Sequence, residues 1–489
     1  MRTLVRVAVT RRRIVRSEAI ALAVAIAFGC AMAALPLHAQ NAQGPGGAWS
    51  GSLATPGAPL AIGITLAQDA AGVWTGTMDI PAQGAKGLPL GEIVVDGDSV
   101  SFRLLAGAGN PRATARLSAD GTRLSGTFTQ GGALLPLELT RGAAARPLSR
   151  PQEPARPFPY REEEVAYRND AAQVRLAGTL TLPAGTGPFP AVLLITGSGA
   201  QDRDETIAGH KPFLVLADHL TRRGLAVLRV DDRGVGGSDL GPLTATTLDF
   251  AGDVRAGLAY LRSRADIDRA RVGLIGHSEG ANVAAIVAAD APDTAFMVMM
   301  AGTGLSGDEI LYLQAAGLAR LQGAGDALVA WDRSIRERVY ELVKSETNGA
   351  ADEARRLALT ESAPPAPGGP EASGRALAAT LLKGASGAWF RHFLAYDPAP
   401  TLRRVRCPVL AIIGDNDVQV PAGQNLPAIR GALQAGGNRD FTVTNLPRLN
   451  HLFQTSVTGG VAEYATIEET IAPAALTLIS DWILARVRP

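Results

Sequence analysis

Beyond about residue 163, short apolar runs alternate with longer stretches of helical periodicity. The runs 190–195, 225–230 and 272–275 have the length and apolar character of buried strands, whereas 248–262 repeats apolar residues at the spacing of an amphipathic helix. Strands that alternate with helices in this way form a parallel sheet with helices on both faces. Ligands bind to such a sheet beyond the carboxyl ends of its strands.

Two flanking regions have different patterns. Residues 303–399 consist mainly of long helical stretches, which a proline-rich bend at 364–370 interrupts, and we interpret this region as a helical cap inserted over the site. Residues 45–142 have strand character with Asp-Gly and Gly-Gly turns, which predicts an antiparallel β-domain or small barrel. Residues 143–159, rich in Pro, Ala and Arg, form the predicted linker to an α/β domain over 160–489.

The first 39 residues have the pattern of an export signal. Arg11 to Arg13 precede an apolar run over 19–37, and Ala39 offers a small residue for cleavage before Gln40. We therefore predict a secretory signal peptide, a periplasmic or secreted protein, and no stable membrane insertion after cleavage. An uncleaved membrane anchor is the alternative, because the run is long enough for one.

The first candidate catalytic motif is Gly276-His277-Ser278-Glu279-Gly280. The motif follows the predicted strand 272–275 and precedes a helical segment, which is the setting of a Gly-x-Ser-x-Gly nucleophile elbow. Glycine at both ends allows the sharp turn and the close packing of strand and helix. Ser278 is therefore the predicted nucleophile.

A serine hydroxyl is a weak nucleophile unless an imidazole removes its proton and a carboxylate orients that imidazole. On this type of sheet the acid and then the histidine follow the serine in the chain. Asp417 lies in the loop after the apolar run 407–413, and His451 lies in a later loop. We predict Asp417 as the acid, with Asp415 as the alternative, and His451 as the base.

The oxyanion of the tetrahedral intermediate needs two N–H donors. The backbone N–H of Glu279, directly after the nucleophile, and that of Ser198, in the Gly-rich loop after the strand 190–195, are the predicted donors. In the predicted cap, three aromatic residues, Trp389, Phe390 and Phe393, either line a substrate pocket or form the core of the cap.

Five sequence blocks occur in the order typical of one superfamily. They are 196–205, 229–238, 276–280, 414–420 and 449–454. From about Glu163 to the end, the chain resembles the α/β-hydrolase superfamily, and more narrowly bacterial esterases related to the bile-acid acyltransferase and prolyl-oligopeptidase-like hydrolases. The resemblance implies hydrolysis of small carboxylic esters through an acyl-enzyme. One departure is Thr196, because many relatives have a histidine there.

Three alternative functions stay open at this point. A thioesterase would use the same chemistry, and an exopeptidase or amidase of the prolyl-oligopeptidase type would in addition need carboxylates that bind a peptide amine, for which Asp202, Asp204 and Glu205 are candidates. A non-catalytic envelope-binding protein would act through its β-domain.

Composition excludes some other classes of function. The formal net charge of +1 gives no reason to expect nucleic acid as a partner. The sequence contains no His-Glu-x-x-His, no phosphate-binding loop and no complete dinucleotide fingerprint. We therefore expect no metal and no cofactor, and the sequence does not define an oligomeric state.

Overall fold

The structure is a computed structural model of the 489-residue chain. It describes residues 44–53, 60–80, 85–105, 111–130, 133–142, 149–346, 350–385 and 387–487. The predicted export signal over residues 1–39 lies outside the described residues. Among the described helices, none combines the length and the hydropathy needed to cross a lipid bilayer.

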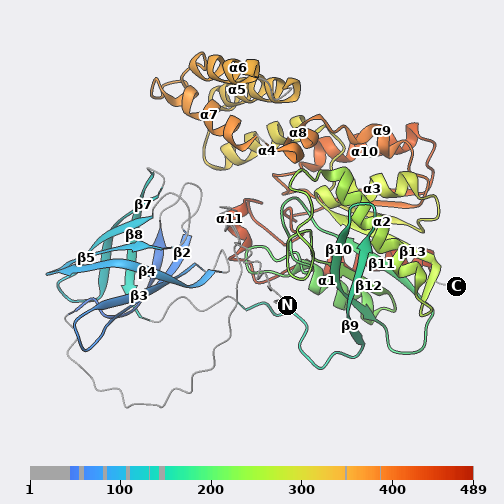
Figure 1. Cartoon of the computed structure of the whole chain (residues 1–489), viewed down its shortest axis with the longest axis horizontal. Helices are drawn as coiled ribbons and strands as arrows, with labels where there is room; N and C mark the ends of the chain where they lie inside the picture. The colour runs from blue at the N-terminus through green and yellow to red at the C-terminus, as the bar shows by residue number, and fades with distance from the viewer. Residues whose placement is uncertain are drawn as a thin grey trace, which may run out of the picture. The chain divides into compact units, whose positions relative to one another are not determined.

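The first part of the chain is a closed, eight-stranded antiparallel barrel (Figure 1). Its strands are β1 (Gly47–Leu53), β2 (Leu60–Gln68), β3 (Trp74–Ile80), β4 (Ala85–Asp96), β5 (Ser99–Leu104), β6 (Arg112–Leu117), β7 (Arg123–Gln130) and β8 (Ala133–Arg141). Alternate side chains, among them Trp49, Ile64, Phe102 and Leu137, fill the interior as one apolar core. The prediction of a small antiparallel β-domain is confirmed.

Glycine allows the barrel strands to approach one another closely. A Cβ atom at Gly51 would collide with the carbonyl oxygen of Glu138, and one at Gly126 would collide with that of Thr114. Both glycines lie inside strands of the barrel, where the neighbouring backbone approaches closely. The barrel therefore depends on residues without a side chain at these two positions.

The second part of the chain is built on an eight-stranded sheet with the order β16-β15-β14-β13-β11-β12-β10-β9. The strands are β9 (Arg161–Asn169), β10 (Val174–Leu182), β11 (Phe189–Ile195), β12 (Ala226–Val230), β13 (Ile267–His277), β14 (Met297–Met300), β15 (Val409–Gly414) and β16 (Phe441–Leu446). Strands β11 to β16 are parallel, and only β10 runs antiparallel to both of its neighbours. The strand order reverses at β11, so the loops after β11 and β13 border the crevice in which such sheets bind ligands.

Helices cover both faces of this sheet. They are α1 (Pro212–Arg222), α2 (Thr247–Ser263), α3 (Glu279–Asp290), α9 (Pro398–Leu402), α10 (Ala422–Ala435), α11 (Val461–Tyr464) and α12 (Pro473–Val487). Helices α2, α3 and α10 bury their apolar residues in one core, and α1 and α12 bury theirs in a second core on the opposite face. The prediction of an α/β sheet covered on two faces is confirmed.

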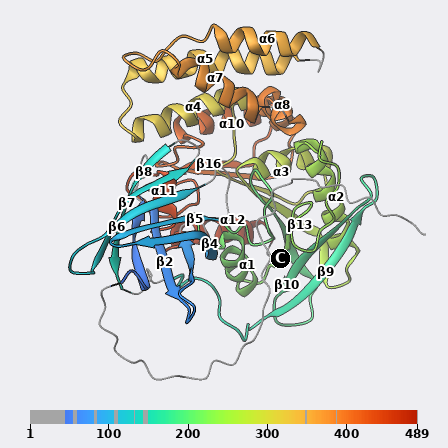
Figure 2. The same ribbon diagram turned by 60° about the vertical axis from the view of Figure 1, so that its left-hand side comes forward.

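Five helices between β14 and β15 form the cap. They are α4 (Gly307–Leu321), α5 (Asp326–Ser345), α6 (Ala350–Glu361), α7 (Ser373–Gly384) and α8 (Ala388–Ala395). The cap has its own apolar core, which includes Ile335, Val339, Leu382 and Leu394. Helices α4 and α8 lie between the sheet and the layer of α5 to α7 (Figure 1, Figure 2). The cap thus places α4 and α8 next to the carboxyl ends of the strands.

Candidate active site

Ser278 occupies a strained turn between β13 and α3. Its φ and ψ angles are 54° and −120°, a conformation that serine rarely adopts. The turn is held in place because the Ser278 N–H donates to the carbonyl oxygen of Met300 over 2.8 Å. This conformation is the one that the nucleophile-elbow motif requires.

The two glycines of the motif are needed for steric reasons. A Cβ atom at Gly276 would collide with the backbone of Gly280, and a Cβ atom at Gly280 would collide with the carbonyl oxygen of Ile195 in β11. The start of α3 therefore packs directly against the end of β11. This close approach places Ser278 beside the loop that follows β11.

The structure brings Asp417 and His451 together. His451 Nδ1 lies 2.8 Å from Asp417 Oδ2, and both side chains are almost completely buried. The other carboxylate oxygen of Asp417 accepts the N–H groups of Gln419 and Val420, both at 2.8 Å. The alternative acid, Asp415, instead accepts the backbone N–H of Arg448. Asp417 is therefore the carboxylate that orients His451.

Ser278 and His451 line the same cavity, whose volume is about 240 Å³. All three cap aromatics named from the sequence, Trp389, Phe390 and Phe393, also line it. They come from α8, where Phe390 in addition packs against the core of the cap. The two interpretations of these aromatics are thus compatible, because the same helix face contributes to the cavity and to the cap.

The predicted oxyanion donors border this cavity as well. Glu279 is the first residue of α3, so its N–H has no acceptor within the helix. In the loop after β11, the Gly197 N–H donates to Glu205 over 2.8 Å, whereas the Ser198 N–H has no acceptor among the described residues. The Thr196 hydroxyl donates to Asp232 over 2.8 Å and so fixes the start of the loop. Ser198 and Glu279 therefore offer two unpaired N–H groups beside Ser278.

A family model described as the alpha/beta hydrolase fold matches residues 190–443, which is more than half of the chain. The chain belongs to the α/β-hydrolase family. The resemblance drawn from the five sequence blocks is thereby confirmed. The matched region includes the elbow and the acid, and it ends shortly before His451.

Among the relatives of this α/β hydrolase is esterase EstD of Thermotoga maritima, which is 28% identical over 298 residues, or 60% of this chain and 61% of the esterase. An uncharacterized protein of Mycobacterium tuberculosis is 34% identical over 133 residues, or 27% of this chain and 43% of that protein. The chain thus spans less than two thirds of the length of these curated relatives.

Solved structures of similar fold include the α/β hydrolase GrgF from Penicillium sp. sh18, with 16% identity and a TM-score of 0.41 over 67% of this chain and 99% of that one. Another is Est1E from Butyrivibrio proteoclasticus with bound ferulic acid, with 15% identity and a TM-score of 0.37 over 66% of this chain and 99% of that one.

One buried carboxylate of this α/β hydrolase, named from the sequence only as a candidate for binding a peptide amine, has different partners in the structure. Glu205 is 2% exposed, and its Oε1 accepts both the Gly197 N–H and, over 2.9 Å, Nδ1 of His277. The other ring nitrogen of His277 donates to the carbonyl oxygen of His451 over 2.9 Å. Through His277, Glu205 thus joins the loop after β11 to the backbone of His451.

The contact with Glu205 also affects the pKa of His277. Burial lowers the pKa of His277, but the Glu205 carboxylate and the hydrogen bonds of both ring nitrogens outweigh burial, so the pKa lies above its usual value. A protonated His277 can donate from both nitrogens at once. This agrees with its two acceptors, a carboxylate and a carbonyl.

The other acidic residues of the segment after the oxyanion loop have internal partners. Asp204 pairs with Arg229, and Asp202 accepts the N–H groups of Asp204 and Thr206. Together with Glu205, these were the candidates for binding a peptide amine. The structure uses all three to hold the loop.

The side chain of Glu279 connects the elbow to the cap. Its Oε1 accepts the Thr247 hydroxyl over 2.7 Å and the Trp389 indole N–H over 2.8 Å. The carboxylate is almost completely buried. Because Trp389 belongs to α8, this hydrogen bond links the cap to the residue that follows Ser278.

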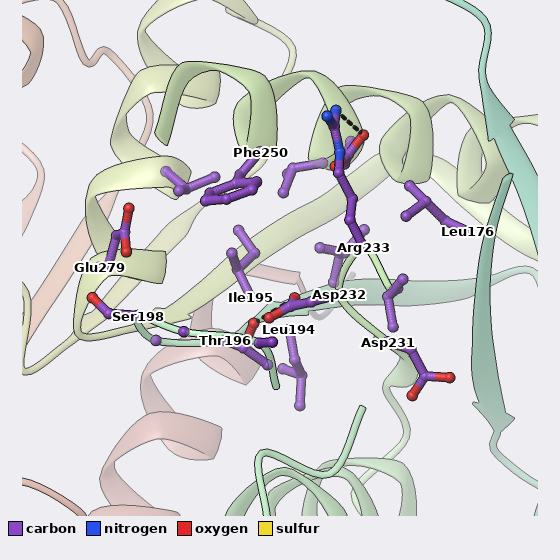
Figure 3. Close-up of a pocket in the computed structure, with 18 of the residues that line it drawn as sticks. Leu176, Leu194, Ile195, Thr196, Ser198, Asp231, Asp232, Arg233, Phe250 and Glu279 are labelled. Atoms are coloured by element: carbon purple, nitrogen blue, oxygen red, sulfur yellow. Dashed lines mark hydrogen bonds and ion pairs between the residues drawn. The ribbon is translucent and has the colours of Figure 1, made fainter. Parts of the chain in front are cut away.

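The structure also contains a second and larger cavity, of about 440 Å³ (Figure 3). It lies between the sheet and α2, and it shares Gly197, Ser198, Glu279 and Trp389 with the cavity that contains Ser278. In Figure 3, Ser198 and Glu279 lie at one end, and Leu176 and Arg233 lie at the other. The two cavities therefore share the residues predicted as oxyanion donors.

The residues that line the larger cavity include a carboxyl group with a raised pKa. Burial raises the pKa of Asp232 from 3.8 to about 7, although hydrogen bonds from Gln201 and Thr196 act in the opposite direction. The nearby Arg233 forms an ion pair with Asp253 over 2.6 Å. Among the described residues, no group of three or more His, Cys, Asp or Glu side chains could hold a metal ion.

Proposed function

We propose that this α/β hydrolase cleaves carboxylic esters through an acyl-enzyme formed on Ser278. One observation carries the proposal: Ser278, in its strained turn, and His451, paired with Asp417, line the same cavity. The sequence similarity to an esterase supports an ester as the substrate.

In the first half of the reaction, His451 Nε2 takes the proton of the Ser278 hydroxyl while the oxygen attacks the carbonyl carbon. Asp417 keeps the proton of His451 on Nδ1 and stabilises the imidazolium that forms. The N–H groups of Ser198 and Glu279 stabilise the oxyanion. His451 then protonates the leaving alcohol, which departs and leaves the acyl group on Ser278.

In the second half, His451 deprotonates a water molecule that attacks the acyl-enzyme. The second tetrahedral intermediate collapses, the acid product leaves, and the proton returns to Ser278. The cap limits the size of the substrate and excludes bulk water from the acyl-enzyme. We therefore propose small esters with short or medium acyl chains.

An ester is favoured over an amide for two reasons. An alkoxide leaves more easily than an amine, and the carboxylates that would bind a peptide amine, Asp202, Asp204 and Glu205, are already engaged with other groups of the protein. A thioester presents the same carbonyl geometry as an ester. The experiment must therefore compare the three types of bond.

The test is a rate assay of the purified protein on p-nitrophenyl esters from acetate to palmitate, on acyl thioesters and on aminoacyl p-nitroanilides. We expect ester cleavage to be fastest and Ser278→Ala to reduce it by at least about 10³-fold. Ser263→Ala, at the other end of α2 from the Glu279 contact, is the control and should keep the wild-type rate. Ester turnover that survives Ser278→Ala would remove the proposal.

A further inference from the structure

We propose that the 440 Å³ cavity between the sheet and α2 binds the acyl part of the substrate, and that this part is an apolar chain of medium length. This inference rests on the proposed ester hydrolysis and assigns each half of the ester to one of the two cavities.

The position of His451 determines where the leaving alcohol lies. His451 must protonate the alcohol oxygen, so that oxygen has to be within hydrogen-bonding distance of the imidazole. His451 lines the 240 Å³ cavity, and neither His451 nor Ser278 occurs among the described residues that line the larger one. The alcohol is therefore bound in the smaller cavity, under the cap aromatics.

The oxyanion donors then direct the acyl substituent into the other cavity. Ser198 and Glu279 line both cavities, so a carbonyl oxygen bound to their N–H groups lies at the junction. With the alcohol on the side of His451, the remaining substituent of the carbonyl carbon points toward the larger cavity. Attack by Ser278 does not require the acyl chain to pass His451.

The size and the lining of the larger cavity define the chemical class of the acyl group. Sites for small molecules usually measure about 300–1,000 Å³, so the 440 Å³ cavity can hold the bulk of a substrate, whereas the 240 Å³ cavity suits a small alcohol. The walls of the larger cavity include Leu176, Leu193, Phe250 and Val254. The ion pair of Arg233 with Asp253 lines the cavity away from Ser198 (Figure 3). An apolar chain of limited length fits this shape.

Phe250 is the position at which the assignment can be tested. It lies on α2, is half-buried, lines only the larger cavity and is not part of the catalytic machinery. Phe250→Ala lengthens the space for the chain, and Phe250→Trp shortens it. Leu311, on α4 of the cap, lines only the smaller cavity and provides the matched control, Leu311→Ala.

The experiment measures kcat/KM of the full chain for two substrate series: p-nitrophenyl esters of increasing acyl length, and methyl to butyl esters of one acid. For the wild type we expect kcat/KM to rise by about fourfold for each buried methylene up to a medium-length acyl chain, and then to fall. Phe250→Ala should move the optimum to longer acyl chains and Phe250→Trp to shorter ones. Leu311→Ala should change only the preference for the alcohol.

The outcomes separate this inference from the proposed function. If Ser278→Ala removes ester turnover but both Phe250 variants keep the wild-type acyl preference, the assignment of the cavity is wrong and the proposed function stands. A shift of the alcohol preference in the Phe250 variants would likewise overturn the assignment. If the wild type hydrolyses no ester of either series, both proposals fall. Circular dichroism and thermal unfolding of each variant show whether it is folded, and either Phe250 variant alone is sufficient for the test.

Discussion

At the scale of single residues, two aspartates two positions apart have different environments. Asp417 is buried against His451, whereas Asp415 is exposed and only accepts one backbone N–H, that of Arg448. An aspartate that orients an imidazole fixes its tautomer and stabilises its positive charge. An aspartate that accepts one N–H in a turn contributes to loop geometry alone.

We therefore predict that Asp417→Asn lowers kcat for esters by about 10⁴-fold, because an amide at this position can stabilise the wrong tautomer and carries no charge. Asp415→Asn should change kcat by no more than about threefold, since the asparagine oxygen still accepts the Arg448 N–H. Parallel steady-state kinetics of the two variants checks this. Equal losses would show that the acid has been assigned to the wrong residue.

The predictability of these residues from the sequence depends on how local their interactions are. Ser278 is recognisable because the elbow needs only five consecutive residues and their flanking elements. Asp417 and His451 follow from their order in the chain and from their loops. The contact of Glu205 with His277 could not be found in this way, because the two residues are 72 positions apart and an acidic loop residue is usually solvated.

At the scale of elements, the site depends on the close packing of α3 against β11. Gly280 is the contact point, since a Cβ atom there would collide with the carbonyl oxygen of Ile195. The collision is with backbone, which cannot move aside as a flexible side chain can. Both elements would have to separate, and the loop that carries Ser198 would move with β11.

Gly280→Ala should therefore lower the free energy of unfolding by about 3 kcal/mol and reduce ester turnover as well. Gly431→Ala is the matched control: it lies inside α10, and a Cβ atom there would meet nothing within 4 Å. Alanine in a helix interior should raise stability by about 0.5–1 kcal/mol. Urea unfolding of both variants measures the difference, and a stable Gly280→Ala protein would contradict the packing described.

The sequence predicts these elements well because hydrophobic periodicity reports on them directly. Both the alternation of strands and helices and the helical region over 303–399 are visible as patterns. The hydrogen bond between Trp389 of α8 and Glu279 of α3 is not visible in the sequence, because it depends on how the cap packs against the α/β domain. The junction of the two cavities depends on the same packing.

At the scale of the whole molecule, the barrel and the α/β domain have separate apolar cores. The chain enters the α/β domain along a segment in which Arg150 donates to the carbonyl oxygens of Ala465 and Ile467, at 2.9 and 2.6 Å. Gln152 binds the backbone of Ile471 in the same region. This segment therefore belongs structurally to the α/β domain.

A chain that begins at residue 149 should keep kcat/KM for esters within about threefold of the full chain, because it retains both cores of the α/β domain and the contacts of Arg150 and Gln152. A chain that begins at residue 160 loses those contacts and should unfold several degrees lower. Enzyme kinetics and thermal unfolding of the two truncations provide the comparison. A large loss of activity in the longer truncation would instead assign the barrel a part in the reaction.

The two hydrogen bonds that Glu205 accepts also have an evolutionary consequence. Its Oε1 accepts hydrogen bonds from both the Gly197 N–H and His277. His277 in turn donates a hydrogen bond to the carbonyl oxygen of His451. Any lineage that replaces Glu205 leaves a buried histidine without its acceptor and loosens the oxyanion loop in the same step. Positions 205 and 277 should therefore vary together among homologues, although the histidine adjoins the nucleophile and the glutamate belongs to another loop.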